Sequence, residues 1–298
     1  MFQIFVDSAA NLPAVIAKRY QIQVISFVNL VNGQELVCYQ PDLSPEEERR
    51  KGTEYYNAMR EGCEVKTSLI STATFEHAFQ DVLDADQDVL YISLSKNISG
   101  NYNSARLAAE ELADKTINGH KIRLVDSLNA SLAQGILAIY ASKLRDKGKT
   151  LDETADFLES CVGKMNGLFT VGDLKYLFNT GRIMKSVATI GNVLKIKPIL
   201  KGNKDGYIVS HKKVRGRKVA LNTLINIFCN NIVDPEKQIV GIAHADAYED
   251  SLYVMEKIQE RVKVGGFINT SYDFCTGSHV GPDTIALFFM GKDRELLA

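Results

Sequence analysis

The sequence predicts an α/β protein of two domains, and three observations carry that prediction. The chain has 298 residues, which exceeds one typical domain and fits two. In residues 1–165, apolar strand-like runs alternate with amphipathic segments, which predicts a mostly parallel sheet with flanking helices. In residues 166–298, strands and turn signals follow one another more directly, which predicts a C-terminal α+β domain with antiparallel pairs.

Strands of the first domain are each expected to lead into a polar loop and a helix. Asn32-Gly33 between apolar flanks predicts a hairpin. Ser44-Pro45 followed by three glutamates predicts the beginning of a polar helix. We expect strands at residues 2–6, 23–26, 34–38, 89–94 and 122–125, and further helices at 13–19, 72–83, 101–113 and 130–145.

The second domain is expected to combine hairpins with helices. An Asp205-Gly206 turn joins an apolar run that ends at Leu200 to a strand at 207–209, which indicates a hairpin. We expect further strands at 168–171, 239–244, 267–272 and 284–290, and helices at 173–178, 215–230 and 247–262.

Composition and charge narrow the classes of function. Hydrophobic residues make up 45% and charged residues 24% of the chain, as in ordinary globular proteins. The formal net charge of -1 provides no overall attraction to nucleic acid, so we expect no nucleic-acid partner. The N-terminus lacks a secretory pattern and no apolar run reaches roughly 20 residues. Five scattered cysteines suit a reducing compartment, so we expect a cytoplasmic protein.

Four polar segments follow predicted strands and are the candidate ligand-binding loops. In an open α/β sheet, ligands bind in the crevice at the carboxyl ends of the strands. Hydroxyl groups in such loops can hold a carboxylate through charge-assisted hydrogen bonds. The segments are Asp7-Ser8, Lys66-Thr67-Ser68, residues 95–100 and Asp126-Ser127.

The segment around Ser99 and Gly100 has the features of an anion site. It follows a buried strand and opens a helix, so free backbone N–H groups and the positive end of the helix dipole face the loop. Gly100 permits close approach of a ligand, and Ser99 adds a hydroxyl donor for a carboxylate or a phosphate. Alternatively, Ser99 is only an N-cap and Gly100 only relieves a turn, which is the more frequent situation for such a segment alone.

Thr67, Ser68 and His279 are further candidates for a binding site. The hydroxyl groups of Thr67 and Ser68 either contact the same anion or cap the helix that follows. His279 lies in residues 277–282 between two late strands, where a structural role and a ligand-binding role are equally open.

Signatures of familiar enzymes are absent from the sequence. It contains no Walker-type phosphate loop, no His-Glu-x-x-His, no Gly-x-Ser-x-Gly and no clean Gly-x-Gly-x-x-Gly motif. We identify no nucleophile with its own general base and no paired carboxylates, so we expect no catalytic residues and no metal ligands. One alternative stays open, in which Asp7 and Asp126 meet from two strands and hold a metal ion. The absence of these signatures favours a binding protein over an enzyme.

Motifs along nearly the whole chain follow the order found in the DegV family, and the chain resembles this family in that ordered set. A single motif would be weak evidence, whereas the series is specific. The matching elements are Asp7-Ser8 with Leu12-Pro13, Lys66-Thr67-Ser68, Ile98-Ser99-Gly100 with Tyr102 and Ser104-Ala105, Asp126-Ser127, Asp173-Leu174 with Tyr176-Leu177, Gly181-Arg182-Ile183, Lys197-Pro198-Ile199-Leu200, Gly206, and Ser278-His279 with Gly281-Pro282.

The resemblance implies a protein of the FakB type that binds one long-chain fatty acid, with its acyl chain in an apolar tunnel. Members of this type present the acid to a separate fatty-acid kinase, which makes acyl-phosphate for phospholipid synthesis. The resemblance implies no cofactor besides the bound acid, and it leaves room for transient membrane contact. The implied carboxylate-binding residues are Thr67, Ser68, Ser99, Gly100 and His279, with Arg182 as a candidate for contact with the partner or the head group.

Two departures from the family pattern and several alternatives accompany the resemblance. Asn101 replaces the usual threonine and Asp283 the usual glycine, and both are expected beside the head group, where they would affect ligand identity or kinase partnership. Arg182 is expected either to contact a partner at the surface or to pair with an internal carboxylate. Apolar residues 136–144 line the tunnel or pack in the core. The alternative functions are a stand-alone small-molecule phosphotransferase and a regulatory protein that binds another anion.

Overall fold

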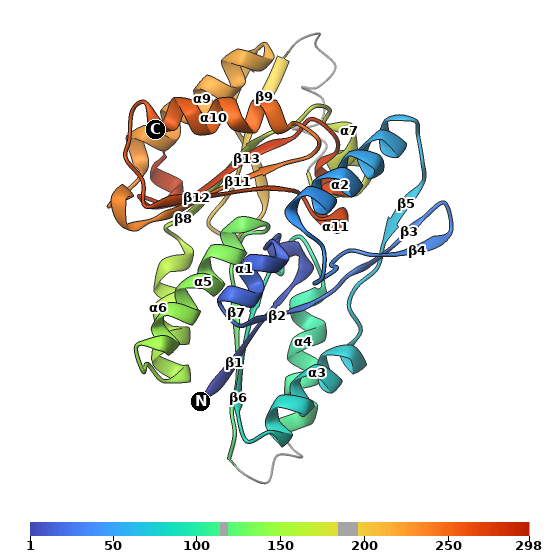
Figure 1. Ribbon diagram of the computed structural model, residues 1–298, viewed down its shortest axis with the longest axis vertical. Helices are drawn as coiled ribbons and strands as arrows, with labels where there is room; N and C mark the ends of the chain where they lie inside the picture. Colours follow the sequence, from blue (N-terminus) through green and yellow to red (C-terminus); the bar gives the residue numbers. More distant parts are fainter. Residues whose placement is uncertain (114–118, 184–195, 298) are drawn as a thin grey trace.

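A computed structural model describes residues 1–113, 119–183 and 196–297 (Figure 1). Its first sheet has four strands in the order β2-β1-β6-β7, and every neighbouring pair is parallel. This arrangement confirms the parallel sheet predicted from the recurrence of strand, loop and helix. The strands are β1 (Phe2–Asp7), β2 (Ile22–Ile25), β6 (Asp88–Ser93) and β7 (Ile122–Asp126).

Helices cover both faces of this sheet, as Figure 1 shows. Alternate residues of a strand point to opposite faces, so Phe5 and Tyr91 pack on one side while Ile4 and Leu90 pack on the other. Because both faces are covered, the central strands β1 and β6 are mostly apolar. On one face lie α3 (Thr72–Asp84) and α4 (Asn101–Ala113), and on the other α1 (Ala14–Arg19), α5 (Leu132–Asp146) and α6 (Leu151–Val162).

The second sheet has six strands in the order β10-β9-β8-β13-β11-β12. Its pairs are antiparallel except β11 with β12, so the predicted α+β character of the C-terminal part is confirmed. Helices α9 (Arg217–Asn231) and α10 (Tyr248–Gln259) cover its outer face. The strands are β8 (Met165–Thr170), β9 (Ile196–Gly202), β10 (Ile208–Arg215), β11 (Ile239–His244), β12 (Gly266–Ser271) and β13 (Ile285–Met290).

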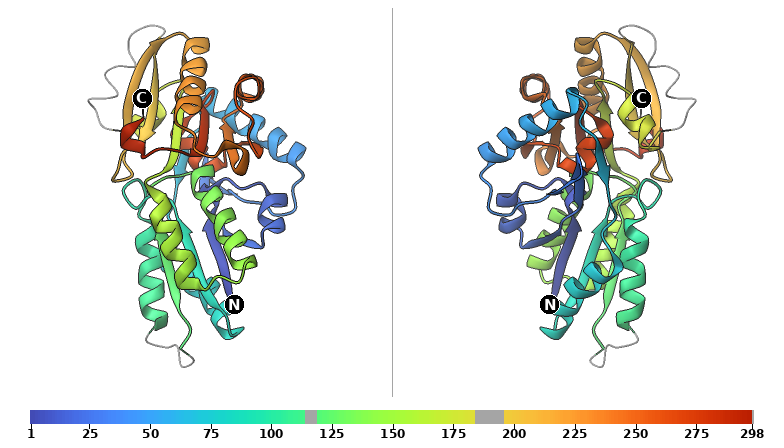
Figure 2. Two further views of the ribbon diagram at one scale, coloured as in Figure 1. Left: turned by 90° about the vertical axis from the view of Figure 1, so that its left-hand side faces the viewer. Right: turned by 90° about the vertical axis from the view of Figure 1, so that its right-hand side faces the viewer.

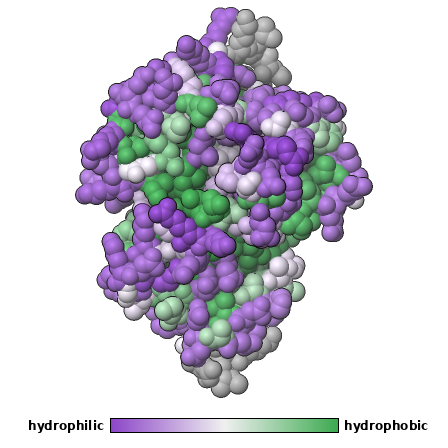
Figure 3. Space-filling model, in the orientation of Figure 1, coloured by the Kyte–Doolittle hydropathy of each residue, from purple (hydrophilic) through white to green (hydrophobic). Residues whose placement is uncertain are grey.

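Helix α5 lies between the two sheets and joins them through one apolar core. Leu132 and Ile136 pack against β11 at Gly241, where a Cβ atom would lie 2.9 Å from the Leu132 Cβ. The sheets stack along the long axis of the molecule, with the N-terminus at one end (Figure 2). On the face seen in Figure 3, apolar side chains gather at the waist between the two halves. Because the two halves share this core, the division of the chain into domains 1–165 and 166–298 remains a prediction.

A small antiparallel sheet, β4-β3-β5, projects from one side of the molecule together with α2 (Pro45–Arg60) (Figure 1). The predicted hairpin is present, and Asn32 and Gly33 have the positive φ angles of 49° and 82° that a primed turn requires. The predicted start of α2 is also confirmed, because the Ser44 side chain accepts a hydrogen bond from the Glu47 amide. The strands are β3 (Val28–Val31), β4 (Gln34–Val37) and β5 (Val65–Thr67).

Two short helices lie near the junction of the three sheets. The helix expected at 173–178 is α7 (Lys175–Asn179). Helix α11 (Phe274–Val280) was not predicted, and it begins at Asp273, whose carboxylate accepts from the amides of Cys275 and Thr276. Short 3-10 turns are η1 (Ser8–Ala10), η3 (Pro235–Lys237) and η4 (Arg294–Leu296).

No helix within the described residues is both long and apolar enough to span a membrane.

Candidate functional site

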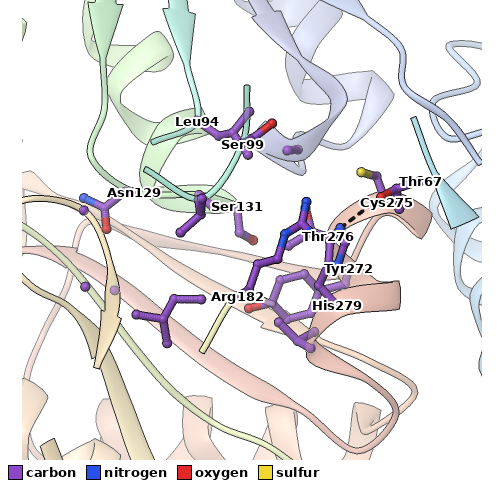
Figure 4. A pocket seen from close by; sticks show the side chains of 18 of the residues that line it. Thr67, Leu94, Ser99, Asn129, Ser131, Arg182, Tyr272, Cys275, Thr276 and His279 are labelled. Carbon is purple, nitrogen blue, oxygen red and sulfur yellow. Dashed lines mark hydrogen bonds between the residues drawn. The ribbon is translucent and has the colours of Figure 1, made fainter. Parts of the chain in front are cut away.

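A cavity of about 400 Å³ opens where the loops after β1, β6 and β7 meet the second sheet and α11 (Figure 4). The position matches the crevice at the carboxyl ends of parallel strands, where ligands bind in open α/β sheets. All six residues proposed from the sequence line it. They are Thr67, Ser68, Ser99, Gly100, Arg182 and His279.

Helix α11 brings the polar side chains of one end together. His279 on α11 faces Thr67 on β5, with 3.4 Å between the His279 Nε2 and Thr67 Oγ1 atoms. Arg182, which follows α7, reaches into the same end of the cavity (Figure 4). These three side chains come from segments more than ninety residues apart, so only the tertiary fold unites them.

Two glycines of the His279 motif allow α11 to pack this closely. A Cβ atom at Gly277 would lie 2.0 Å from the Tyr56 hydroxyl oxygen, and one at Gly281 would lie 2.1 Å from the Tyr176 ring. Gly281 also has a φ of 77°, a conformation that other residues rarely adopt. The glycines therefore serve the packing that positions His279.

His279 is a neutral side chain in this site. Burial, assisted by the Arg182 cation, lowers the pKa of His279 to about 3. Its Nδ1 atom is buried and has no hydrogen-bond partner among the described residues. At neutral pH the imidazole can therefore exchange a hydrogen bond with a ligand but supplies no positive charge.

Arg182 is the cation among the described residues that line the cavity. Burial lowers the pKa of Arg182 from its ordinary value, and one arm of its guanidinium donates to the Thr180 carbonyl oxygen. No carboxylate of the described residues pairs with it. The internal ion pair that the sequence offered as one alternative is therefore not found among the described residues. The Arg182 side chain lies half-buried in the cavity wall rather than on an open surface. An unpaired, partly desolvated guanidinium favours an anionic ligand.

Ser99 fills the capping role, and its geometry leaves the anion-binding role open. Its Oγ accepts a hydrogen bond from the Asn101 amide at 3.2 Å, which is a cap at the start of α4. The hydroxyl proton remains able to donate into the cavity. Gly100 packs close to the Leu69 side chain. A Cβ atom at position 100 would lie 3.1 Å from Leu69 Cδ1.

Thr67 and Ser68 differ in what their hydroxyl groups can offer a ligand. The exposed Ser68 donates its proton to the Val28 carbonyl oxygen at 2.7 Å. Thr67 faces His279 inside the cavity instead. Of the two, Thr67 has the hydroxyl better placed for a bound anion.

Asn101 does not line the cavity, contrary to our expectation. Its side chain is fully buried and donates to Asp7 Oδ2 at 3.1 Å and to the Tyr91 hydroxyl at 2.8 Å. Burial raises the pKa of Asp7, which also accepts from Tyr91 at 2.7 Å. Asp7 is therefore part of an internal polar network, and no three His, Cys, Asp or Glu side chains gather in a metal-binding arrangement within the described ranges.

Asp283 also points away from the cavity. Its carboxylate pairs with Arg60 at 2.8 Å on the surface, and its φ of 64° is in the left-handed region. Glycine and aspartate are among the residues that tolerate this conformation. Both departures from the family pattern thus have local structural explanations and do not touch the ligand space.

The apolar wall comes largely from residues that the sequence analysis did not single out. Residues 136–144, proposed as an alternative lining, pack in the core or beside it and do not reach the cavity. The sequence marked the loop after β7 as polar through its Asp126-Ser127 pair. The residues of this loop that line the cavity come after that pair and belong to no motif. The additional lining includes Leu128, Asn129, Ala130, Ser131, Phe169, Ile208, Tyr272 and Phe288.

Comparisons with known proteins agree with this architecture. A DegV domain-containing protein from Clostridium perfringens is 35% identical over 99% of this chain and 99% of its own length. The structure of a DegV lipid-binding protein from Thermotoga maritima superimposes with a TM-score of 0.83 at 28% identity, covering 99% of this chain and 100% of that chain.

A second Thermotoga maritima protein, whose structure is described as revealing a fatty acid binding function, has a TM-score of 0.80 at 27% identity, covering 96% of this chain and 98% of that chain. The family model described as "Uncharacterised protein, DegV family" matches residues 1–292. With its motifs, its fold and this match over nearly its full length, the chain belongs to the DegV family.

Proposed function

We propose that this protein binds one long-chain fatty acid, with the carboxylate at the polar end of the cavity and the acyl chain along its apolar wall. The observation that carries the proposal is the cavity in which Arg182, which pairs with no carboxylate of the described residues, and the hydroxyl groups of Thr67 and Ser99 face a largely apolar interior. The two Thermotoga maritima relatives, one described as a lipid-binding protein and the other as revealing a fatty acid binding function, support it.

Energetics favour such a ligand. Each buried methylene contributes roughly 0.8 kcal/mol before the costs of association are subtracted. A hydrogen bond between a charged carboxylate and a fixed donor adds about 1.5–3 kcal/mol. A cavity of about 400 Å³ falls in the range of roughly 300–1,000 Å³ that small-molecule sites occupy.

The second part of the proposal is that the protein presents the bound acid to a separate fatty-acid kinase. Ser68, Gly100 and Leu69 lie at the polar end, and Leu69 is 53% exposed, so the carboxylate would sit close to the surface. The fragment Gly148-Lys149-Thr150, which is the nearest to a phosphate loop, forms the turn between α5 and α6 and does not line the cavity. The proposal therefore assigns phosphoryl transfer to the partner.

Native mass spectrometry of the purified protein tests the binding proposal. We expect an additional mass equal to one long-chain fatty acid, and loss of that mass after delipidation. A bound nucleotide, or a protein that takes up no fatty acid when delipidated, would contradict the proposal.

An assay with Mg²⁺, labelled ATP and oleate tests the presentation step. We expect acyl-phosphate only when a fatty-acid kinase is added. Product formed by this chain alone would instead support an enzyme.

A further inference from the structure

The cavity contains a polar atom that a plain acyl chain would not use. Asn129, in the loop after β7, lines the cavity although only 8% of the residue is exposed. Its Nδ2 atom donates to the carbonyl oxygens of Ser127 at 3.2 Å and Met165 at 3.0 Å. Both partners can only accept, so the orientation of the amide is fixed. Among the described residues, no donor is bonded to the remaining Oδ1 atom, which is therefore a free acceptor.

Two glycines keep the space beside this acceptor open. A Cβ atom at Gly167 would lie 3.3 Å from Asn129 Oδ1, and one at Gly202 would lie 3.9 Å from it. Both glycines line the cavity, and neither has a positive φ. Their backbone conformations do not require glycine. The missing side chains leave room for the Phe288 ring beside Gly167 and for the Arg294 guanidinium beside Gly202, and they also leave Oδ1 accessible.

Ser131 adds a second polar position between Asn129 and the head-group end, as Figure 4 shows. The residue is 2% exposed, and its Oγ atom has no hydrogen-bond partner among the described residues. Tyr272 lines the same cavity. Burial raises the pKa of the Tyr272 phenol, and the Ser131 hydroxyl partly offsets this rise. The middle of the cavity is thus not uniformly apolar.

An unsubstituted acyl chain would bury the Asn129 acceptor without a partner, which is unfavourable. A hydroxyl group on the chain would donate to it. We propose that the cavity selects a long-chain fatty acid with a hydroxyl group along its acyl chain, and that Asn129 Oδ1 accepts the hydrogen bond from that hydroxyl. This inference rests on the proposed fatty-acid binding and names the class of acid.

Titration of the delipidated protein tests the class of ligand. The probes are octadecanoic acid and octadecanoic acids hydroxylated at mid-chain or at the terminal carbon. One hydrogen bond to the acceptor predicts that at least one hydroxy acid binds about ten-fold more tightly than the parent acid. If the parent acid binds as tightly as every hydroxy acid, the inference is wrong while the proposed function stands. If no acid binds, the proposed function itself fails.

Asn129→Leu tests the assigned atom, and Asn166→Leu is its matched control. Asn166 is 1% exposed and also donates to two carbonyl oxygens, those of Lys164 at 2.9 Å and Lys292 at 3.0 Å, but it does not line the cavity. We expect Asn129→Leu to remove the preference for the hydroxy acid, and Asn166→Leu to retain it.

Gly167→Ala provides a second test that leaves both hydrogen bonds of the Asn129 amide in place. Its methyl group would lie 3.3 Å from Oδ1 and cover the acceptor, so we expect the preference to fall even if Asn129→Leu does not fold. Persistence of the full preference in Gly167→Ala, or in a folded Asn129→Leu protein, would overturn the assignment.

Discussion

At the scale of residues, the described lining of the cavity contains one cation and several neutral donors. Arg182 supplies the charge, while His279 stays neutral because burial and the neighbouring guanidinium disfavour its protonation. A carboxylate bound here would therefore depend mainly on Arg182. This division of roles leads to separate predictions for the two side chains.

Arg182→Gln is expected to weaken fatty-acid binding by about ten- to a hundred-fold, since it removes a charge-assisted contact. Arg50→Gln, which changes an exposed arginine paired only with Glu54, is the control and should bind normally. The measurement is titration of delipidated proteins with octadecanoic acid. Equal affinity in the two variants would place Arg182 outside the head-group site and favour a contact with a partner.

His279→Asn is expected to make the protein less sensitive to acid. The pKa of His279 is about 3 in the folded protein and 6.5 when unperturbed, so below pH 6.5 the unfolded chain binds a proton that the folded chain does not. Wild-type stability then falls, relative to the variant, by about 1.4 kcal/mol per pH unit as the pH drops below 6.5. Urea unfolding of both proteins at several pH values measures this difference. A difference that does not change with pH would contradict a neutral, buried His279.

Asp283→Gly should be nearly neutral for stability and for binding. Glycine suits the positive φ at this position, while the substitution removes an ion pair with Arg60 in which Asp283 is 59% exposed. Such exposed pairs contribute about 0–1 kcal/mol. Thermal unfolding measures the effect on stability, and titration with fatty acid measures the effect on binding. A large loss of affinity would show that Asp283 contacts the ligand.

Sequence reasoning identified the polar residues at one end of the cavity more readily than the rest of its lining. Thr67, Ser99, Arg182 and His279 belong to polar motifs in a recognisable order, and the structure brings them to one cavity. Asn129 carries no such signal, because an asparagine after a strand is equally suited to a turn. The direction of a side chain, as at Asn101, depends on tertiary contacts that the sequence does not contain.

At the scale of elements, local signals predicted most strands and helices. The Asn32-Gly33 hairpin and the capped start of α2 rest on short-range chemistry and are confirmed. Helix α11 escaped notice because it has seven residues, two of them glycine or serine at 277 and 278, and owes its position to packing against Tyr56 and Tyr176. Strand β5 has three residues and is a strand because it pairs with β3.

The turn η4 fixes the loops behind the cavity through Arg294, which is 2% exposed. Its guanidinium donates to the carbonyl oxygens of Leu128 at 2.8 Å and Met165 at 3.2 Å, and also to that of Val162. Arg294→Met is expected to lower the free energy of unfolding by about 3 kcal/mol, because these buried acceptors lose their donor. Chemical denaturation measures the change, and an unaltered midpoint would show that the contacts do not stabilise the loops.

At the scale of the whole molecule, two sheets share a core through α5, and the cavity forms where their loops meet. The sequence predicted the parallel sheet and the α+β part because the relative direction of strands follows from the kind of connection between them. It could not predict the cavity, since the apolar residues of a binding wall and of a packed core look alike in sequence. Residues 136–144, which pack with the core and not along the ligand space, illustrate this limit.

The most direct test of fatty-acid binding compares octadecanoic acid with the corresponding alcohol by calorimetric titration of the delipidated protein. We predict that one molecule of the acid binds per chain with a negative heat-capacity change, since apolar surface is buried. The alcohol should bind at least about ten-fold more weakly, because it lacks the charge that Arg182 recognises. Equal affinities for acid and alcohol, or no binding of either, would contradict the account.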